Sequence, residues 1–271
     1  MTTEQARLFR SLHVPASPLV LANAWDVASA RIVEDAGAAA IATTSAGVAW
    51  SLGAPDGDLI GRDLAVDLIA RIARVTTVPV SADIEGGHAD TPEGVTETVA
   101  AVVAAGAVGI NIEDGPRPPE EVVPRIAAAR AASDDVFVNA RIDTFLRGLG
   151  GVPETLERAA AYLAAGADGI FVPGATDPAV ITALVEGIDA PVNVMAHPGA
   201  PSVKELAGLG VARVSVGSGI SQSAYALVRE SARELFSTGT YSRLEESFDY
   251  GALNTLLTPR VETANHRDRR G

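Results

Sequence analysis

Three short segments carry polar and charged side chains in a spacing that could do chemistry. Each follows an apolar run and alternates polar with apolar positions: Asp83-Ile84-Glu85, Asn111-Ile112-Glu113 and Asn139-Ala140-Arg141-Ile142-Asp143. Successive side chains of a strand point to opposite faces, so the polar members of each segment share one face. Clustered carboxylates repel one another, and Mg²⁺ relieves that repulsion while keeping several waters. A neighbouring arginine is suited to a bidentate grip on a carboxylate. We therefore expect metal-assisted chemistry on a small carboxylate.

Two kinds of segment alternate along the chain that must position these residues. Apolar, β-branched runs predict strands over 19–25, 39–45, 78–85, 109–114, 137–144, 169–174, 190–196 and 213–219. Apolar residues at helical spacing predict helices over 27–35, 62–75, 92–105, 119–132, 153–165, 178–186, 203–208 and 221–236. An Ala-Gly-Ala triplet recurs at the helix-to-strand junctions around Gly37, Gly106 and Gly166, where a left-handed glycine would turn the chain toward the next strand.

Eight β-α units in 271 residues indicate an α/β protein with one closed (β/α)8 TIM barrel, a fold of typically ~250 residues. We expect an N-terminal helix or lead-in over 1–18, the barrel over 19–237, and a helical extension and tail over 238–271. A doubly wound open sheet is the alternative, but it normally has a glycine-rich loop after the first strand, and NAWDVASA is not one. Active sites of such barrels lie at the carboxyl ends of the strands, where the three polar segments fall.

Composition excludes several classes of protein. The chain has 21 Lys and Arg against 34 Asp and Glu, a net charge of −13, which disfavours nucleic-acid binding. It has no Cys, so disulfides, thiolate nucleophiles and Cys-ligated metals are excluded. No apolar run approaches the roughly 18 residues of a membrane span. The first residues, MTTEQARLFR, lack a signal-peptide core, and we expect a cytoplasmic protein without membrane partners.

Some of these residues also have purely structural explanations. Asp83, Glu113 and Arg141 could form an ion-pair network inside the barrel, although buried charge pairs are weak stabilising devices. Asp26 is placed to cap the helix that follows it. His88 lies in a Gly-rich loop, where a histidine is usually solvated.

Four motifs, in order along the chain, resemble the phosphoenolpyruvate mutase/isocitrate lyase superfamily from about Leu19 to Phe236. They are Thr44-Ser45-Ala46-Gly47 with Gly53-Ala54-Pro55-Asp56, then Ser81-Ala82-Asp83, Asn111-Ile112-Glu113-Asp114 and Ala140-Arg141-Ile142-Asp143. The resemblance implies a (β/α)8 barrel that passes its eighth helix to a neighbouring subunit in a homodimer or homotetramer. It also implies bound Mg²⁺, with Mn²⁺ as the alternative metal. The implied reaction makes or breaks a C–C or C–P bond of a small 2-oxo acid or dicarboxylate through an enolate-like intermediate.

The resemblance also implies residue roles. Asp83 and Glu113 would hold the metal, assisted by Asp56, which would also face the substrate. Arg141 would bind carboxylate and stabilise developing negative charge, a catalytic role that Glu113 would share. The substrate would also meet Ser45, Ala46, Gly47 and Asn193, and proton transfer is assigned to Glu85 and His88 as local substitutes.

The chain departs from the family in three places. Ser81 stands where the first aspartate of the family's Asp-Ala-Asp is expected, so the metal would be weaker, shifted toward Asp83 and Glu85, or absent. The lyases' Lys–Cys loop is replaced by residues 115–119, GPRPP, and Gly174 lies near the place of a lyase glutamate. These changes argue against isocitrate or methylisocitrate lyase activity. Two alternatives remain: a non-catalytic carboxylate-binding barrel, and a sugar-phosphate aldolase of another barrel family that uses VSVGSGI as a phosphate cradle.

Overall fold

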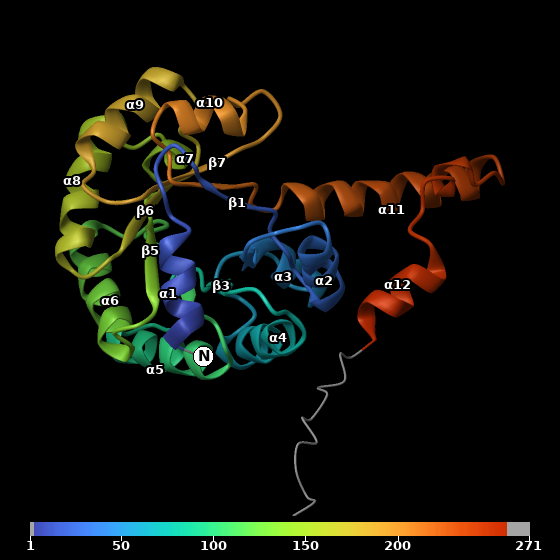
Figure 1. Ribbon diagram of the computed structural model, residues 1–271, viewed down its shortest axis with the longest axis horizontal. Coiled ribbons are helices and arrows are strands. Elements are labelled where there is room, and N and C mark those ends of the chain that lie inside the picture. The colour runs from blue at the N-terminus through green and yellow to red at the C-terminus, as the bar shows by residue number, and fades with distance from the viewer. Residues whose placement is uncertain (1–2, 259–271) are drawn as a thin grey trace, which may run out of the picture.

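The computed structural model describes residues 3–258 and shows a barrel of parallel strands (Figure 1). The strands are β1 Leu19–Leu21, β2 Ile41–Ala42, β3 Val80–Asp83, β4 Gly109–Glu113, β5 Phe137–Arg141, β6 Gly169–Val172, β7 Val192–Met195 and β8 Arg213–Ser215. They pair in the order β1-β8-β7-β6-β5-β4-β3-β2. Ala24 closes the ring just beyond β1, because its N–H donates to Ala42 at 2.9 Å and its carbonyl accepts from Thr44 at 3.0 Å. The predicted (β/α)8 barrel is confirmed.

Helices follow the strands and cover the outside of the barrel. They are α2 Val27–Asp35, α4 Arg62–Val75, α5 Pro92–Ala104, α6 Pro119–Ala132, α8 Gly151–Ala164, α9 Pro178–Gly187, α10 Val203–Gly208 and α11 Gly219–Ser237. Asp26 caps α2 in a capping box with Ser29, as its structural explanation predicts. Gly37, Gly106 and Gly166 have φ of 97°, 111° and 109°, so the repeated triplets do end helices in the left-handed region.

Two short helices interrupt the predicted pattern. α3 (Ser45–Ser51) and α7 (Thr144–Arg147) begin where the strand predictions over 39–45 and 137–144 end. The regular strands are shorter than predicted because the chain turns at the barrel mouth. A short apolar run is compatible with either a strand or a buried helix, so periodicity alone could not separate α3 from the strand before it.

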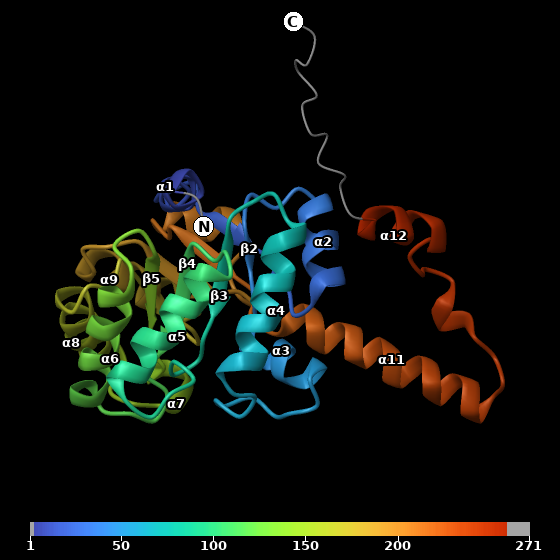
Figure 2. The same ribbon diagram turned by 90° about the horizontal axis from the view of Figure 1, so that it is seen from below.

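The N-terminal helix α1 (Thr3–Ser11) closes the base of the barrel, opposite the mouth. Figure 2 shows α1 on one side of the barrel and α3 and α7 on the other. Phe9 of α1 is fully buried, and its ring meets those of His13 and Phe137 edge-on at centroid distances of 4.9 and 5.7 Å. His13 in turn stacks on Phe137 at 4.1 Å. Any open site must therefore lie at the other end.

Helix α11, which follows the last strand, projects away from the barrel (Figure 1). α11 leaves large apolar side chains exposed, among them Leu227, Val228, Leu235 and Phe236, the last at 85%. The helix predicted in the extension appears as a 3₁₀ turn, η1 (Ser242–Leu244), and a helix, α12 (Tyr250–Leu257). The predicted tail over 259–271 lies outside the described residues. Within the described part of the chain, no helix is both long and apolar enough to cross a membrane.

Candidate active site

Three predicted site residues end neighbouring strands at the mouth of the barrel. Asp83 is the last residue of β3, Glu113 of β4 and Arg141 of β5, and Glu113 is in register with Arg141. Arg141 Nη1 lies 2.6 Å from Glu113 Oε2. The charge of Asp83 acts on both Glu113 and Arg141, so all three side chains converge on one region. The structure brings together the residues that strand alternation predicted to meet.

Three carboxyl groups at this mouth, those of Glu113, Asp56 and Glu85, have raised pKa values. Burial raises the pKa of Glu113 to about 8; the charge of Arg141 opposes this rise and that of Asp83 adds to it. The pKa values of Asp56 and Glu85 are also raised, first by burial and further by the charge of Asp83. Although burial alone would lower the pKa of Arg141, its acidic neighbours raise it. A divalent cation would favour the ionised carboxylates, so the donor set fits Mg²⁺.

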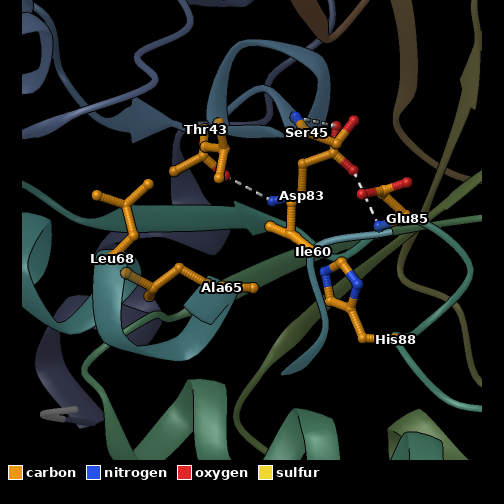
Figure 3. A pocket seen from close by; sticks show the side chains of 10 residues that line it. Thr43, Ser45, Ile60, Ala65, Leu68, Asp83, Glu85 and His88 are labelled. Atoms are coloured by element: carbon orange, nitrogen blue, oxygen red, sulfur yellow. Dashed lines mark hydrogen bonds between the residues drawn. The ribbon is translucent and has the colours of Figure 1, made fainter. Parts of the chain in front are cut away.

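Asp83 is fixed by backbone and hydroxyl contacts (Figure 3). Its Oδ2 accepts from the backbone N–H of Ser45 at 3.3 Å, and its Oδ1 accepts from the N–H of Glu85 at 3.3 Å. Its own N–H donates to Thr43 Oγ1 at 2.8 Å. The resemblance assigns Ser45 to substrate binding, yet its backbone N–H contacts Asp83, the carboxylate assigned to the metal. A hydrogen bond from the Ser45 side chain favours the ionised form of Asp56.

The start of α3 is tightly packed. Ala46 and Gly47 are buried in its first turn. A Cβ at Gly47 would lie 2.7 Å from Trp25 Cβ and 2.9 Å from Thr44 Cγ2. Only glycine lets the helix approach the β1–α2 connection this closely, and that approach positions Ser45 over Asp83.

Two loops hold each other beside Asp83, in an arrangement we term the clasp: Asp58 and Gly57 on one side, Glu85 to His88 on the other, with Arg117. Glu85 Oε2 accepts from the N–H of Gly57 at 2.8 Å and from that of Asp58. The Asp58 carboxylate accepts from the N–H groups of Gly86 and His88, each at 3.2 Å, and lies 3.5 Å from Arg117 Nη2.

Three members of the clasp combine unusual backbone with possible ligand atoms. Asp58, Glu85 and His88 have φ of 60°, 52° and 47°, a region that L residues rarely adopt. Their carboxylate and imidazole atoms lie within 4.8 Å of one another, the one such group found in the described residues. His88 Nδ1 is 3.3 Å from Asp58 Oδ1. Glu85 Oε1 is buried and has no hydrogen-bond partner in the described chain. The side chain of His88 is only 2% exposed, so the expectation that it is a solvated loop residue is wrong.

Ser81 lies two residues below Asp83 on β3, on the side toward the base, which corrects the position assigned to it. A Cβ on Gly109 would meet both Ser81 Oγ at 3.1 Å and the Phe9 ring at 2.6 Å, so Ser81 faces the base of the barrel. The acidic residues that β3 delivers to the mouth are Asp83 and Glu85, spaced two apart as in an Asp-Ala-Asp motif. The serine is therefore not placed to hold a metal at the mouth. Of the expectations drawn from it, a site shifted toward Asp83 and Glu85 fits this placement, and a weakened metal stays a prediction.

Asn193 belongs to the barrel interior. With Asn111, Asn139 and Arg213 it forms a layer that we term the polar floor. Asn139 Nδ2 donates to Asn111 Oδ1 at 2.9 Å and to Asn193 Oδ1 at 3.2 Å, and Arg213 Nη2 donates to Asn111 Oδ1 at 3.1 Å. Asn193 is 1% exposed, and its side chain is engaged by hydrogen bonds within this layer, so its predicted contact with substrate stays a prediction.

A family model described as phosphoenolpyruvate phosphomutase matches residues 9–236. The chain belongs to this family. Its sequence is 40% identical to that of an uncharacterized protein of Mycobacterium tuberculosis strain H37Rv, over 92% of this chain and 95% of that protein. It is 31% identical to the 2-methylisocitrate lyase of Escherichia coli K12, over 69% of this chain and 68% of the lyase. The resemblance to the phosphoenolpyruvate mutase/isocitrate lyase superfamily is confirmed.

A solved structure of phosphonopyruvate hydrolase in complex with oxalate and Mg²⁺ has the same fold. Its TM-score is 0.81 at 26% identity, covering 94% of this chain and 95% of that one. The family is thus one of enzymes, with a member seen holding a small dicarboxylate and Mg²⁺ together.

Proposed function

We propose that this protein is a Mg²⁺-dependent enzyme that makes or breaks a C–C or C–P bond of a small 2-oxo acid or dicarboxylate. The observation that carries the proposal is the convergence of Asp83, Glu113 and Arg141 at the mouth of the barrel. An anionic substrate would meet both a cation site and a guanidinium there. Phosphonopyruvate hydrolase with its oxalate and Mg²⁺ supports the same pairing of ligands.

Asp83 and Glu113 would hold the metal, directly or through water, with Asp56 and Glu85 nearby. Burial and mutual repulsion of these carboxyl groups favour a cation among them. The clasp is the second possible site, but Asp58 already accepts two backbone N–H groups, and an imidazole nitrogen suits Mg²⁺ less well than oxygen does. When bound, the metal would stabilise negative charge on an enolate-like oxygen.

Arg141 would bind the substrate carboxylate. Nε and Nη2 donate to Asp143 at 2.7 and 3.2 Å, and Nη1 contacts Glu113. A guanidinium has five N–H bonds, so two remain for a ligand. Phe171 supports the group from one side at 5.9 Å. Because the charge of Arg141 is secured by its neighbours, it would stabilise negative charge that develops on the substrate.

Glu85 and His88 are the groups we propose for proton transfer. Glu85 Oε1 is unpartnered among the described residues, and burial raises the pKa of this carboxyl, so it can hold a proton more readily than an exposed glutamate. Replacing Glu85 by Gln and His88 by Asn, one at a time, tests this role. Full turnover in either variant removes that residue from the proton-transfer step.

The chain lacks the acid/base cysteine of the isocitrate and methylisocitrate lyases, since it contains no Cys. Residues 115–119 carry Arg117 instead, which lies 3.5 Å from Asp58 in the clasp. We therefore propose an activity distinct from those two lyases. The E. coli lyase is similar in sequence, but its reaction would need a different acid here.

We further propose a homodimer or homotetramer in which α11 packs on a neighbouring subunit. The apolar side chains of Leu227, Val228, Leu235 and Phe236 support this arrangement, because exposed apolar surface of this extent usually marks an interface. Light scattering after gel filtration tests it. A monomeric mass at micromolar concentration would contradict it.

The proposed activity is tested by a panel of 2-oxo acids, phosphonopyruvate and 2-hydroxydicarboxylates, assayed with and without Mg²⁺. Oxalate binding is measured in parallel by calorimetry. We expect Mg²⁺-dependent turnover and oxalate binding, both lost in Asp83→Asn. Asp67→Asn is the matched control, because Asp67 lies on the outer face of α4 and is paired with Arg71. Oxalate binding without any turnover would favour the non-catalytic barrel. The absence of both oxalate binding and turnover would refute the proposal.

A further inference from the structure

Arg141 is oriented by a neighbour and not by the strand alone. Asp143 grips one edge of the guanidinium through two hydrogen bonds, Nε to Oδ1 at 2.7 Å and Nη2 to Oδ2 at 3.2 Å. A two-point contact of this kind fixes both the position and the plane of the group. Whatever holds Asp143 therefore also sets the direction of the N–H bonds left for a ligand.

Asp143, which follows β5, is itself held by Asp114, which follows the neighbouring strand β4. The backbone N–H of Asp143 donates to Asp114 Oδ1 at 2.9 Å. Asp114 has no exposed surface, and burial raises the pKa of its carboxyl. A carboxylate in that position needs strong partners to remain ionised.

Helix α8 supplies those partners from outside the barrel. Arg158 Nη1 donates to Asp114 Oδ2 at 2.9 Å, and the Tyr162 hydroxyl donates to the same oxygen at 3.2 Å. Arg158 is 8% exposed and Tyr162 is fully buried. An unbroken series of contacts therefore runs from α8 through Asp114 and Asp143 to Arg141.

Stability alone gives a weak reason for this arrangement. Well-packed apolar residues of similar volume often stabilise a core as well as a buried ion pair does. Asp114 and Arg158 are 44 positions apart and meet inside the protein, directly behind the residue that contacts Arg141. Such outer partners commonly orient the groups that touch a ligand.

We propose that Asp114, Arg158 and Tyr162 are positioning residues that set the orientation of the Arg141 guanidinium and so the affinity of the site for carboxylate. The inference rests on the proposed function in taking Arg141 as the carboxylate-binding group. None of the three touches the ligand. They act on it through Asp143.

The test compares Asp114→Asn and Tyr162→Phe with the wild type in two measurements. Calorimetry gives the dissociation constants of Mg²⁺ and, in its presence, of oxalate; NMR of the Arg141 Nε–H signal reports the order of the guanidinium. We expect Asp114→Asn to weaken oxalate binding about tenfold and to shift and broaden the Nε–H signal, with unchanged Mg²⁺ affinity. Tyr162→Phe removes one hydroxyl and should weaken oxalate binding less, in the same direction. Glu157→Gln, on the exposed side of α8, is the control.

Each outcome decides the matter. Wild-type oxalate affinity and an unchanged Nε–H signal in folded Asp114→Asn would overturn the proposal, as would equal loss of Mg²⁺ and oxalate affinity. If Asp114→Asn does not fold, the same criteria apply to Tyr162→Phe. If the wild type does not bind oxalate, the Nε–H signal alone tests whether these residues orient Arg141, and the proposed function fails only if the substrate panel also shows no turnover.

Discussion

Replacing Asp58 by Asn should loosen the clasp while leaving the barrel folded. The Asp58 carboxylate accepts from the N–H groups of Gly86 and His88 and faces Arg117. Burial alone would raise the pKa of Asp58, but hydrogen bonds from His88 and the charge of Arg117 lower it. The clasp therefore stabilises the ionised form, which persists at neutral pH and is lost only as the pH falls through the lowered value.

The magnitude follows from the two backbone hydrogen bonds. A bond to a charged acceptor contributes about 1.5 kcal/mol or more, and an asparagine retains one acceptor oxygen while turning an NH₂ group toward the other donors. The Asp58 side chain is 27% exposed, which reduces the cost. We expect local opening to become more favourable by about 2 kcal/mol, or about 30-fold in the opening constant.

Hydrogen exchange measured by mass spectrometry reports this opening directly. Peptides covering residues 52–61 and 84–90 should exchange about 30-fold faster in Asp58→Asn, and peptides from β4 and β5 should not change. Asp67→Asn removes an exposed aspartate from α4 and serves as the control. Unchanged exchange in both loops would refute the idea that Asp58 holds them together.

Three further predictions concern the base of the barrel and the start of α3. Burial lowers the pKa of His13 to about 3 in the folded protein. In the unfolded chain the pKa is about 6.5, so on acidification the unfolded state takes up a proton first. Between these two pKa values the free energy of unfolding falls by up to about 1.4 kcal/mol per pH unit. In urea titrations His13→Gln should therefore lose about 2.3 kcal/mol less than the wild type between pH 6.5 and 4.5, and parallel losses would contradict this. Phe9→Ala removes a fully buried ring beside Phe137 and should lower the free energy of unfolding by about 3–5 kcal/mol. A loss below about 1 kcal/mol would show that the packing of α1 against the base of the barrel contributes little to stability. Gly47→Ala places a methyl group 2.7 Å from Trp25 Cβ, so it should cost about 1–3 kcal/mol and weaken oxalate binding, and wild-type values of both would argue against a packing role.

The barrel and its strand-end residues could be predicted because both follow from local pattern. Alternation within each strand places Glu113 beside Arg141 once parallel neighbours are assumed, and the structure has them in register. Which level along a strand forms the site does not follow from pattern. Ser81 and Asp83 share a face, and only the structure shows that Ser81 lies beside Gly109 and the Phe9 ring while Asp83 reaches the mouth.

Long-range and strained features were also beyond a single sequence. No motif links Asp114 to Arg158, although Asp114 ends a motif that was recognised, because their contact depends on how α8 packs. The clasp depends on left-handed backbone at Asp58, Glu85 and His88, and these residue types indicate such a conformation far more weakly than glycine does. His13 acquires its lowered pKa from burial and from the charge of Arg213, a residue distant in the chain.

The polar floor has a consequence for how this barrel can vary. Asn139 serves two partners at once, and Asn111 Oδ1 accepts from both Asn139 and Arg213. Replacing one of these amides by an apolar residue would leave its partners buried without a hydrogen bond. We therefore expect these four positions to change together in related sequences. A chimaera that takes one of these strands from a relative should fold only if the strands carrying the partner residues are taken from the same relative.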